Sequence, residues 1–287
     1  MAKIFDSLLL HKLALTKDYL LDNLKNDLPL SQSKKLTDIA KNIIEYCKQS
    51  NRDDLQVRNF FEFFADILGI HYTSIAHHES IKQLCITNYG LEALMLLRPQ
   101  FDSFLKVAHF FEPKDDLNEI HKRVEEFEDW RIIKMSQNLN KSKNFDLFKA
   151  LPNKSYDKDI LKLRKKIQEK YKCNHEKFEE LSKRNHFLSS EQIKSLTKNL
   201  NIFDFYNHVK AESSASLHVT DLSDRMRESE RDSFDGYTFQ IKIQGSGFYP
   251  LHLSNLILVH QLMCWADFFD IKDIIYEEVK DLYGTDK

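Results

Sequence analysis

Residues 91–111 read LEALMLLRPQFDSFLKVAHFF, a stretch typical of a mostly apolar helix that carries a few polar side chains. It continues a helical pattern that begins near residue 73, in which Gly90 is a possible break. Pro99 lies inside this pattern and should kink the helix, because its ring removes a backbone donor and clashes with the preceding turn. Arg98 and Asp102 are one turn apart and therefore share a face. The stretch predicts a long kinked helix with an Arg and an Asp set among apolar neighbours.

The whole chain has the composition of an all-α protein. It contains 6 Gly and 5 Pro among 287 residues, far below the roughly 12% of average usage. Sheets and barrels use these residues at their tight turns, and an apolar content of 42% excludes a disordered chain. We expect an all-α helical bundle with long kinked helices and at most one small β-hairpin. That hairpin is expected within 232–250, where TFQIKI alternates as a strand does.

Breaks in the helical pattern indicate how the chain is organised. Gly69 is expected to end a helix that begins near Asp53, since glycine commonly follows the last helical turn. Residues 1–70 are therefore predicted to form an N-terminal helical segment, and residues 71–287 the helical bundle. Within the bundle, the polar stretch 136–159 is expected to be a linker or an insertion at the edge of the molecule.

Two further elements follow this polar stretch. Residues 160–185 have helical periodicity and mixed charges, which predicts one helix with a solvated face. Ser189 or Ser190, followed by Glu191 or Gln192, matches the capping pattern that starts a helix.

Charge, cysteines and hydropathy restrict the classes of partner and the compartment. A net charge of −2 gives no support for coating DNA or an anionic membrane, although a local basic groove remains compatible with it. The four cysteines are far apart and form no CxxC, as in a reduced, cytoplasmic protein. The most apolar stretch, 251–269, contains His252, Asn255 and Gln261, which a membrane span would bury at high cost. We expect a cytoplasmic protein that does not bind membranes.

The sequence lacks the common motifs for phosphate, dinucleotide and metal binding. It has no Gly-rich phosphate loop and no HExxH. The densest set of ligand-type side chains is His71, His77, His78 and Glu79, but its spacing is not diagnostic, and His77 and His78 point about 100° apart on a helix. We predict no cofactor and no metal, and expect these four residues to be ordinary polar side chains.

Candidate catalytic residues come from two helical stretches. Arg98 and Asp102 belong to the first, and the second is IFDFYNHVKAESSASLHVTDL at 202–222. There, Ser214 and His218 are four residues apart and share a face, with Tyr206 two turns earlier. The structural interpretation is an internal Arg98–Asp102 ion pair and a core histidine at 218. The functional interpretation is that the two stretches converge on one site.

These residues carry a resemblance to a known family. The pattern Arg98-Pro-x-Phe-Asp102, then SSEQIKSLTKNLNIFDFY at 189–206, then Ser214-x-x-x-His218 resembles an uncharacterised all-helical bacterial family from defence-gene neighbourhoods. That family is similar to the HEPN superfamily of toxin and antiviral ribonucleases. The usual HEPN signature, an Arg followed by a His after four to six residues, is absent here. Asp102 also replaces the more common Glu, so a site would have to be composite.

The resemblance implies a HEPN-like bundle and a metal-independent endoribonuclease that acts as a toxin or effector in bacterial antiphage defence. RNA would be the substrate, and the chain would be a homo-oligomer or bind a partner protein of the same defence system. In this interpretation His218 transfers the proton and Arg98 binds the phosphate. Asp102 holds the Arg, and Ser214 and Tyr206 supply hydrogen bonds. The alternative is a non-catalytic helical sensor, adaptor or antitoxin-like partner.

Overall fold

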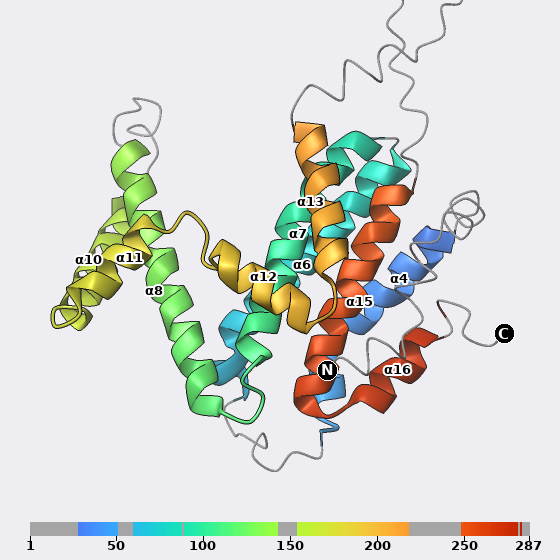
Figure 1. Cartoon of the computed structure of the whole chain (residues 1–287), viewed down its shortest axis with the longest axis horizontal. Helices are drawn as coiled ribbons and strands as arrows, with labels where there is room; N and C mark the ends of the chain where they lie inside the picture. Colours follow the sequence, from blue (N-terminus) through green and yellow to red (C-terminus); the bar gives the residue numbers. More distant parts are fainter. Residues whose placement is uncertain are drawn as a thin grey trace, which may run out of the picture. The chain divides into compact units, whose positions relative to one another are not determined.

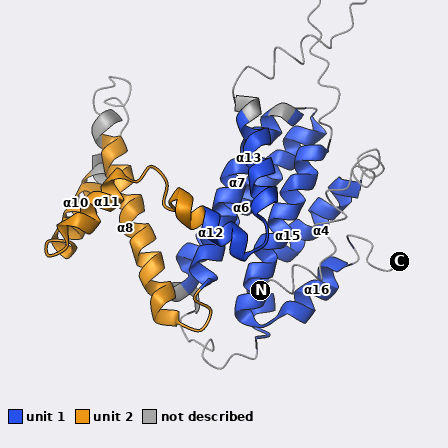
Figure 2. Ribbon diagram, in the orientation of Figure 1, with its two compact units in different colours: residues 1–112, 194–287 blue, residues 113–193 orange. Residues whose placement is uncertain are grey.

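The computed structural model describes residues 28–50, 60–87, 89–142, 154–217, 248–280 and 282. Within these ranges every regular element is an α-helix, which confirms the all-α class predicted from the composition (Figure 1). The chain divides into two compact units, residues 1–112 with 194–287 and residues 113–193 (Figure 2). The expected hairpin at 232–250 falls almost wholly outside the described residues.

Unit 1 is built around one buried helix, α15 (Tyr249–Phe269), which contacts six other described helices. Its side chains are buried along almost the whole length, and Trp265 is completely enclosed. The helices around α15 are α4 (Leu28–Lys41), α5 (Ile43–Cys47), α6 (Phe60–Ile86), α7 (Gly90–Phe111), α13 (Phe203–Leu217) and α16 (Lys272–Lys280).

Aromatic side chains fill the core between α6, α7 and α15. The rings of Phe111 and Phe268 stack with centroids 4.4 Å apart, and Trp265 meets Phe111 edge to face at 4.9 Å. Phe64 of α6 contacts the same group, with its centroid 5.8 Å from that of Phe268. Such pairs add to the free energy gained from burying apolar area. The apolar stretch at 251–269 is therefore the core helix of unit 1.

Among the described residues no helix combines the length and the apolar character that crossing a membrane requires. Several polar side chains of α15 have partners inside the bundle. Asn255 donates to the Pro29 carbonyl at 2.9 Å, and Gln261 donates to His71 at 2.6 Å. Buried polar groups without such partners would be costly, so these contacts specify how α15 is oriented.

The prediction that Gly69 ends a helix is wrong, because α6 continues through it without a break. An added Cβ at Gly69 would meet nothing within 4 Å, so the residue lies on an open side of the helix. Packing of the flanking apolar turns outweighs the low helix propensity of one glycine. The predicted long helix instead breaks at residues 87–89, next to Gly90, and α7 continues through Pro99. The expected boundary at residue 70 lies inside α6.

Unit 2 consists of α8 (Leu117–Ser142), α10 (Lys154–Lys170) and α11 (His175–Lys183). Its core includes Ile133, Ile167 and Leu181, one side chain from each helix. The polar stretch expected at 136–159 belongs to this unit, and its described ends are the last turns of α8 and the start of α10.

The single charged helix predicted for 160–185 is wrong, since the chain turns between α10 and α11. Asn174 caps the new helix by accepting from the Lys177 backbone N–H at 3.2 Å. The hydrophobic periodicity is helical both before and after the turn. The capping residue Asn174 is therefore the feature of the sequence that indicates a new helix. The capping prediction that follows is confirmed: α12 (Ser190–Asn199) begins with reciprocal bonds between Ser189 and Gln192.

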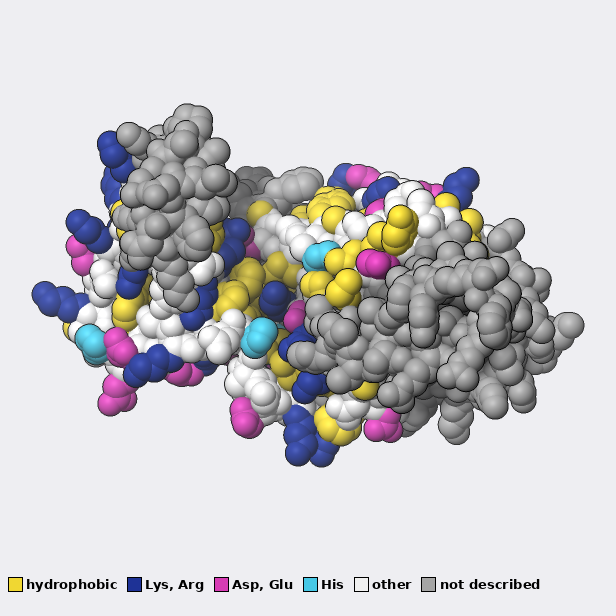
Figure 3. Space-filling model, turned by 90° about the horizontal axis from the view of Figure 1, so that it is seen from above, with side chains coloured by type: hydrophobic (Ala, Val, Ile, Leu, Met, Phe, Trp, Pro, Cys, Tyr) yellow, Lys and Arg dark blue, Asp and Glu magenta, His cyan; other side chains and the backbone are white. Residues whose placement is uncertain are grey.

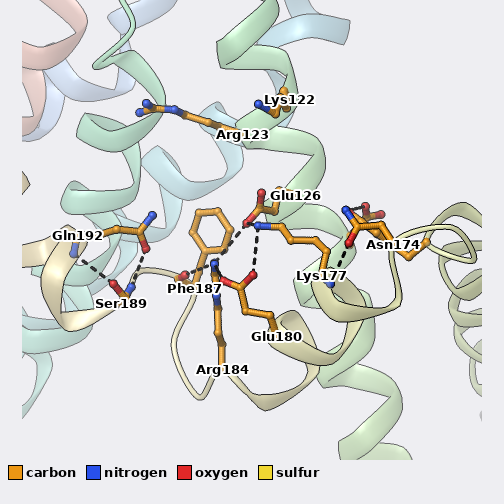
Figure 4. Close-up of polar contacts among 12 residues, drawn as sticks. Lys122, Arg123, Glu126, Asn174, Lys177, Glu180, Arg184, Phe187, Ser189 and Gln192 are labelled. Atoms are coloured by element: carbon orange, nitrogen blue, oxygen red, sulfur yellow. Dashed lines mark hydrogen bonds and ion pairs between the residues drawn. The ribbon is translucent and has the colours of Figure 1, made fainter.

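Ion pairs join α8 to α11 on the surface of unit 2. Glu126 accepts from Lys177 at 2.9 Å and from Arg184 at 3.3 Å, and Arg184 also pairs with Glu180 (Figure 4). Because two cations share one carboxylate, the conformational entropy lost by ordering that carboxylate is offset by more than one ion pair.

Candidate functional site

The candidate site is a stripe along the outer face of α7. Arg98, Asp102 and Lys106 follow one another at four-residue spacing and are partly exposed. Leu97 and Phe104 lie on the opposite face and are buried. Side chains four apart in a helix are neighbours, so the three charged groups form a continuous row about 12 Å long. We call Arg98, Asp102 and Lys106 the α7 charged stripe.

Helix α13 forms one border of this stripe. Phe101 of α7 anchors it, with ring centroids 5.4 Å from Phe205 and 5.5 Å from Tyr206. Burial and the nearby Asp102 carboxylate raise the pKa of Tyr206, while the Arg98 guanidinium opposes that rise. Tyr206 therefore lies within electrostatic range of both residues. The structure brings together three of the five predicted site residues: Arg98, Asp102 and Tyr206.

Helix α6 forms the other border. Burial lowers the pKa of Lys106, and the Asp102 carboxylate partly restores it. Burial also lowers the pKa of His77 on α6, and the Lys106 ammonium lowers it further. The Nδ1 atom of His77 is buried and has no hydrogen-bond partner among the described residues. Sequence spacing did not connect His77 to the site, because His77 belongs to a different helix. Lys106 lies on α7 four residues after Asp102, so helical spacing alone could have indicated it.

Ser214 and His218, the two remaining predicted residues, cannot both be placed. Ser214 lies two turns after Tyr206 on α13 and is partly buried. Eight residues of an α-helix make two full turns plus about 80°. Ser214 therefore remains on the same side of α13 as Tyr206. His218 lies outside the described residues, one position after α13 ends.

Two histidines of the ligand-type set are structural. Burial lowers the pKa of both His71 and His78 to about 4, so both are neutral at pH 7. His71 lies 2.9 Å from the Ala40 carbonyl through Nε2 and accepts from Gln261. No group of His, Cys, Asp and Glu within the described ranges is arranged to hold a metal ion.

His78 connects three helices through hydroxyl groups. Its Nε2 lies 2.8 Å from the Ser33 hydroxyl on α4, and its Nδ1 lies 2.7 Å from the Ser254 hydroxyl on α15. Ser254 in turn donates to the Gln100 side-chain oxygen at 2.6 Å. This network fits a neutral imidazole that donates through Nδ1 and accepts at Nε2. Both ring nitrogens are therefore occupied by the fold.

A further imidazole that sequence reasoning missed lies on another flank of α13. His208 Nε2 is hydrogen-bonded to the Tyr249 hydroxyl at the start of α15. Burial and the Glu212 carboxylate raise the pKa of Tyr249 to about 12. His208 is two residues from Tyr206 and therefore points about 200° away from it around the helix. The His208–Tyr249 pair is separate from the α7 charged stripe.

Comparison of the chain with protein-family models, with curated proteins and with solved structures found no match.

Proposed function

We propose that the α7 charged stripe and α13 form the active site of a metal-independent endoribonuclease with a HEPN-like fold. The observation that supports this is that α13 packs Tyr206 against α7, within electrostatic range of both Arg98 and Asp102. A guanidinium held near a carboxylate and a phenol is suited to bind a phosphodiester with two hydrogen bonds. The helix that carries Tyr206 and Ser214 leads directly to His218.

The reaction we propose needs no group that the chain lacks. The 2′-hydroxyl oxygen of RNA bonds to the adjacent phosphorus, and the bond from phosphorus to the 5′-oxygen breaks. The products are a 2′,3′-cyclic phosphate and a free 5′-hydroxyl. His218 accepts the proton of the 2′-hydroxyl, and its imidazolium then returns that proton to the 5′-oxygen. Arg98 stabilises the negative charge on the phosphate, and Asp102 positions the Arg.

In a cell, such an activity fits a toxin or effector of bacterial antiphage defence. The family resemblance described above suggests this role, together with a homo-oligomeric state or a dedicated partner protein. The all-helical fold agrees with that resemblance. We propose a cytoplasmic site of action, where RNA is accessible.

The test is cleavage of purified RNA by the full chain in the presence of EDTA. His218→Ala should lower the rate by about 10²–10⁴-fold, because it removes the group that transfers the proton. Arg98→Lys should also lose activity while the melting temperature stays near that of the wild type, since an ammonium cannot make the bidentate contact. His175→Ala, at an exposed position of unit 2, is the control and should cleave normally. Cleavage by His218→Ala at the wild-type rate would refute the mechanism, and chelator-sensitive cleavage would contradict metal independence.

The second candidate is a non-catalytic sensor, adaptor or antitoxin-like partner. The charge order of the stripe favours it, because Asp102 lies between Arg98 and Lys106 on one face and can balance cations within the protein itself. In that case expression of the wild-type chain should not be toxic to bacteria, and total RNA should remain intact on a gel.

A further inference from the structure

The outer face of α10 in unit 2 carries a dense group of positive charges. Lys158, Lys162, Lys165 and Lys166 are all exposed. Their spacing places them within an arc of about 100° around the helix, along about 12 Å of its length. Ile160 and Ile167 occupy the opposite face and are buried, and α10 packs against α8. We call the four lysines the α10 lysine face.

Several cations of unit 2 have acidic partners, but these four lysines have none among the described residues. Lys170 pairs with Asp129 at 2.8 Å, and Lys177 and Arg184 both pair with Glu126 (Figure 4). None of the four lysines forms an ion pair with a described carboxylate. Two exposed carboxylates are nearby: Glu169 lies within the same arc of α10, and Asp159 lies at its edge. Neither forms an ion pair with the four lysines in the described structure, and the face keeps an excess of positive charge.

Lys and Arg side chains, dark blue, are frequent on the surface of unit 2, with Asp and Glu side chains, magenta, among them (Figure 3). The chain as a whole has a net charge of −2, so the excess is local. Four unpaired like charges on one helix face repel one another, and a bound polyanion would relieve that repulsion.

We propose that the α10 lysine face binds the sugar–phosphate backbone of the RNA that the protein cleaves. This inference rests on the proposed ribonuclease function. Lysines are flexible point charges that contact phosphates without reading bases, so binding here is independent of sequence. A membrane is disfavoured as the ligand, because the apolar face of α10 is occupied by α8 and cannot enter a bilayer.

The experiment measures binding to a single-stranded 2′-O-methyl RNA labelled with fluorescein, by anisotropy and with the full chain. This RNA cannot be cleaved through its 2′-oxygen, so binding is measured separately from catalysis. The test variant replaces Lys158, Lys162, Lys165 and Lys166 by Gln. Glutamine keeps the helix propensity of lysine, and these side chains have no ion pair to lose. The control variant replaces the exposed Lys34, Lys48, Lys194 and Lys198 by Gln, which changes the net charge equally.

Four phosphate contacts to a single strand should give a slope of about −3 for log affinity against log salt. The affinity of the wild type should therefore fall about 50-fold between 50 and 200 mM salt through these contacts. The test variant should bind about tenfold or more weakly at 50 mM salt, with a correspondingly shallower slope. The control variant should remain within about twofold of the wild type.

Several results would overturn this proposal. The first is that the wild type does not bind the RNA. The second is that the test and control variants lose RNA affinity equally. The third is that the test variant loses binding to phosphatidylserine vesicles while its RNA binding is unchanged. A different result would refute the ribonuclease proposal alone: the wild type binds the modified RNA through these lysines but does not cleave unmodified RNA. Conversely, normal cleavage and binding by the test variant would refute only the α10 proposal.

Discussion

Acidification should destabilise unit 1 through its two buried histidines, His71 and His78. Burial lowers the pKa of each to about 4, whereas in the unfolded chain both should titrate near 6.5. For His78 the nearby Lys82 and Lys41 also favour the neutral form, and Glu79 acts against them. Below pH 6.5 the unfolded state therefore binds protons that the folded state does not.

Linkage sets the sign and the size of this effect. The contribution of these histidines to stability is fully present above pH 6.5 and is lost as the pH falls from 6.5 toward 4. A pKa difference between 6.5 and about 4 corresponds to about 3 kcal/mol for each histidine, or about 6 kcal/mol for both. Since whole domains are stable by about 5–15 kcal/mol, this loss is large enough to unfold the unit.

Urea denaturation followed by circular dichroism at several pH values between 7.5 and 4.5 measures the effect. The double variant with His71→Gln and His78→Gln should be less stable at pH 7, but its free energy of unfolding should vary little between pH 6.5 and 5. His175→Gln, which changes an exposed histidine, should retain the pH dependence of the wild type. A wild-type free energy of unfolding that is constant from pH 7 to 4.5 would refute the reasoning.

Three other predictions concern single side chains. Gly69→Ala should stabilise the protein by about 0.5–1 kcal/mol in urea denaturation, because the helix continues through an open position; destabilisation would contradict this. Phe111→Ala should cost about 3–5 kcal/mol, seen as a lower melting temperature, since it removes the ring stacked on Phe268; a loss below about 1 kcal/mol would contradict the packing. In the native protein iodoacetamide should label only the exposed Cys173, and mass spectrometry after unfolding should find four reactive thiols; burial raises the pKa of the other three, Cys47, Cys85 and Cys264.

Local features of the sequence were sufficient to predict the helical class and the start of α12. The scarcity of Gly and Pro limits the number of tight turns, whatever the tertiary arrangement. The start of α12 follows from Ser189 and Gln192, because a capping box satisfies its own backbone donors within four residues. The shared face of Arg98 and Asp102 likewise depends only on helical geometry.

Contacts between distant segments were not predictable in the same way. Gly69 has the local features of a helix end, yet packing of α6 against α7 and α15 continues the helix through it. The polar residues of α15 are stabilised by partners far away in the chain, such as Pro29 for Asn255, which is 226 residues away, and His71 for Gln261, which is 190 away. His77 of α6 joins the candidate site for the same reason. Periodicity describes which face of a helix is buried, but the identity of its neighbour depends on how all the helices pack together.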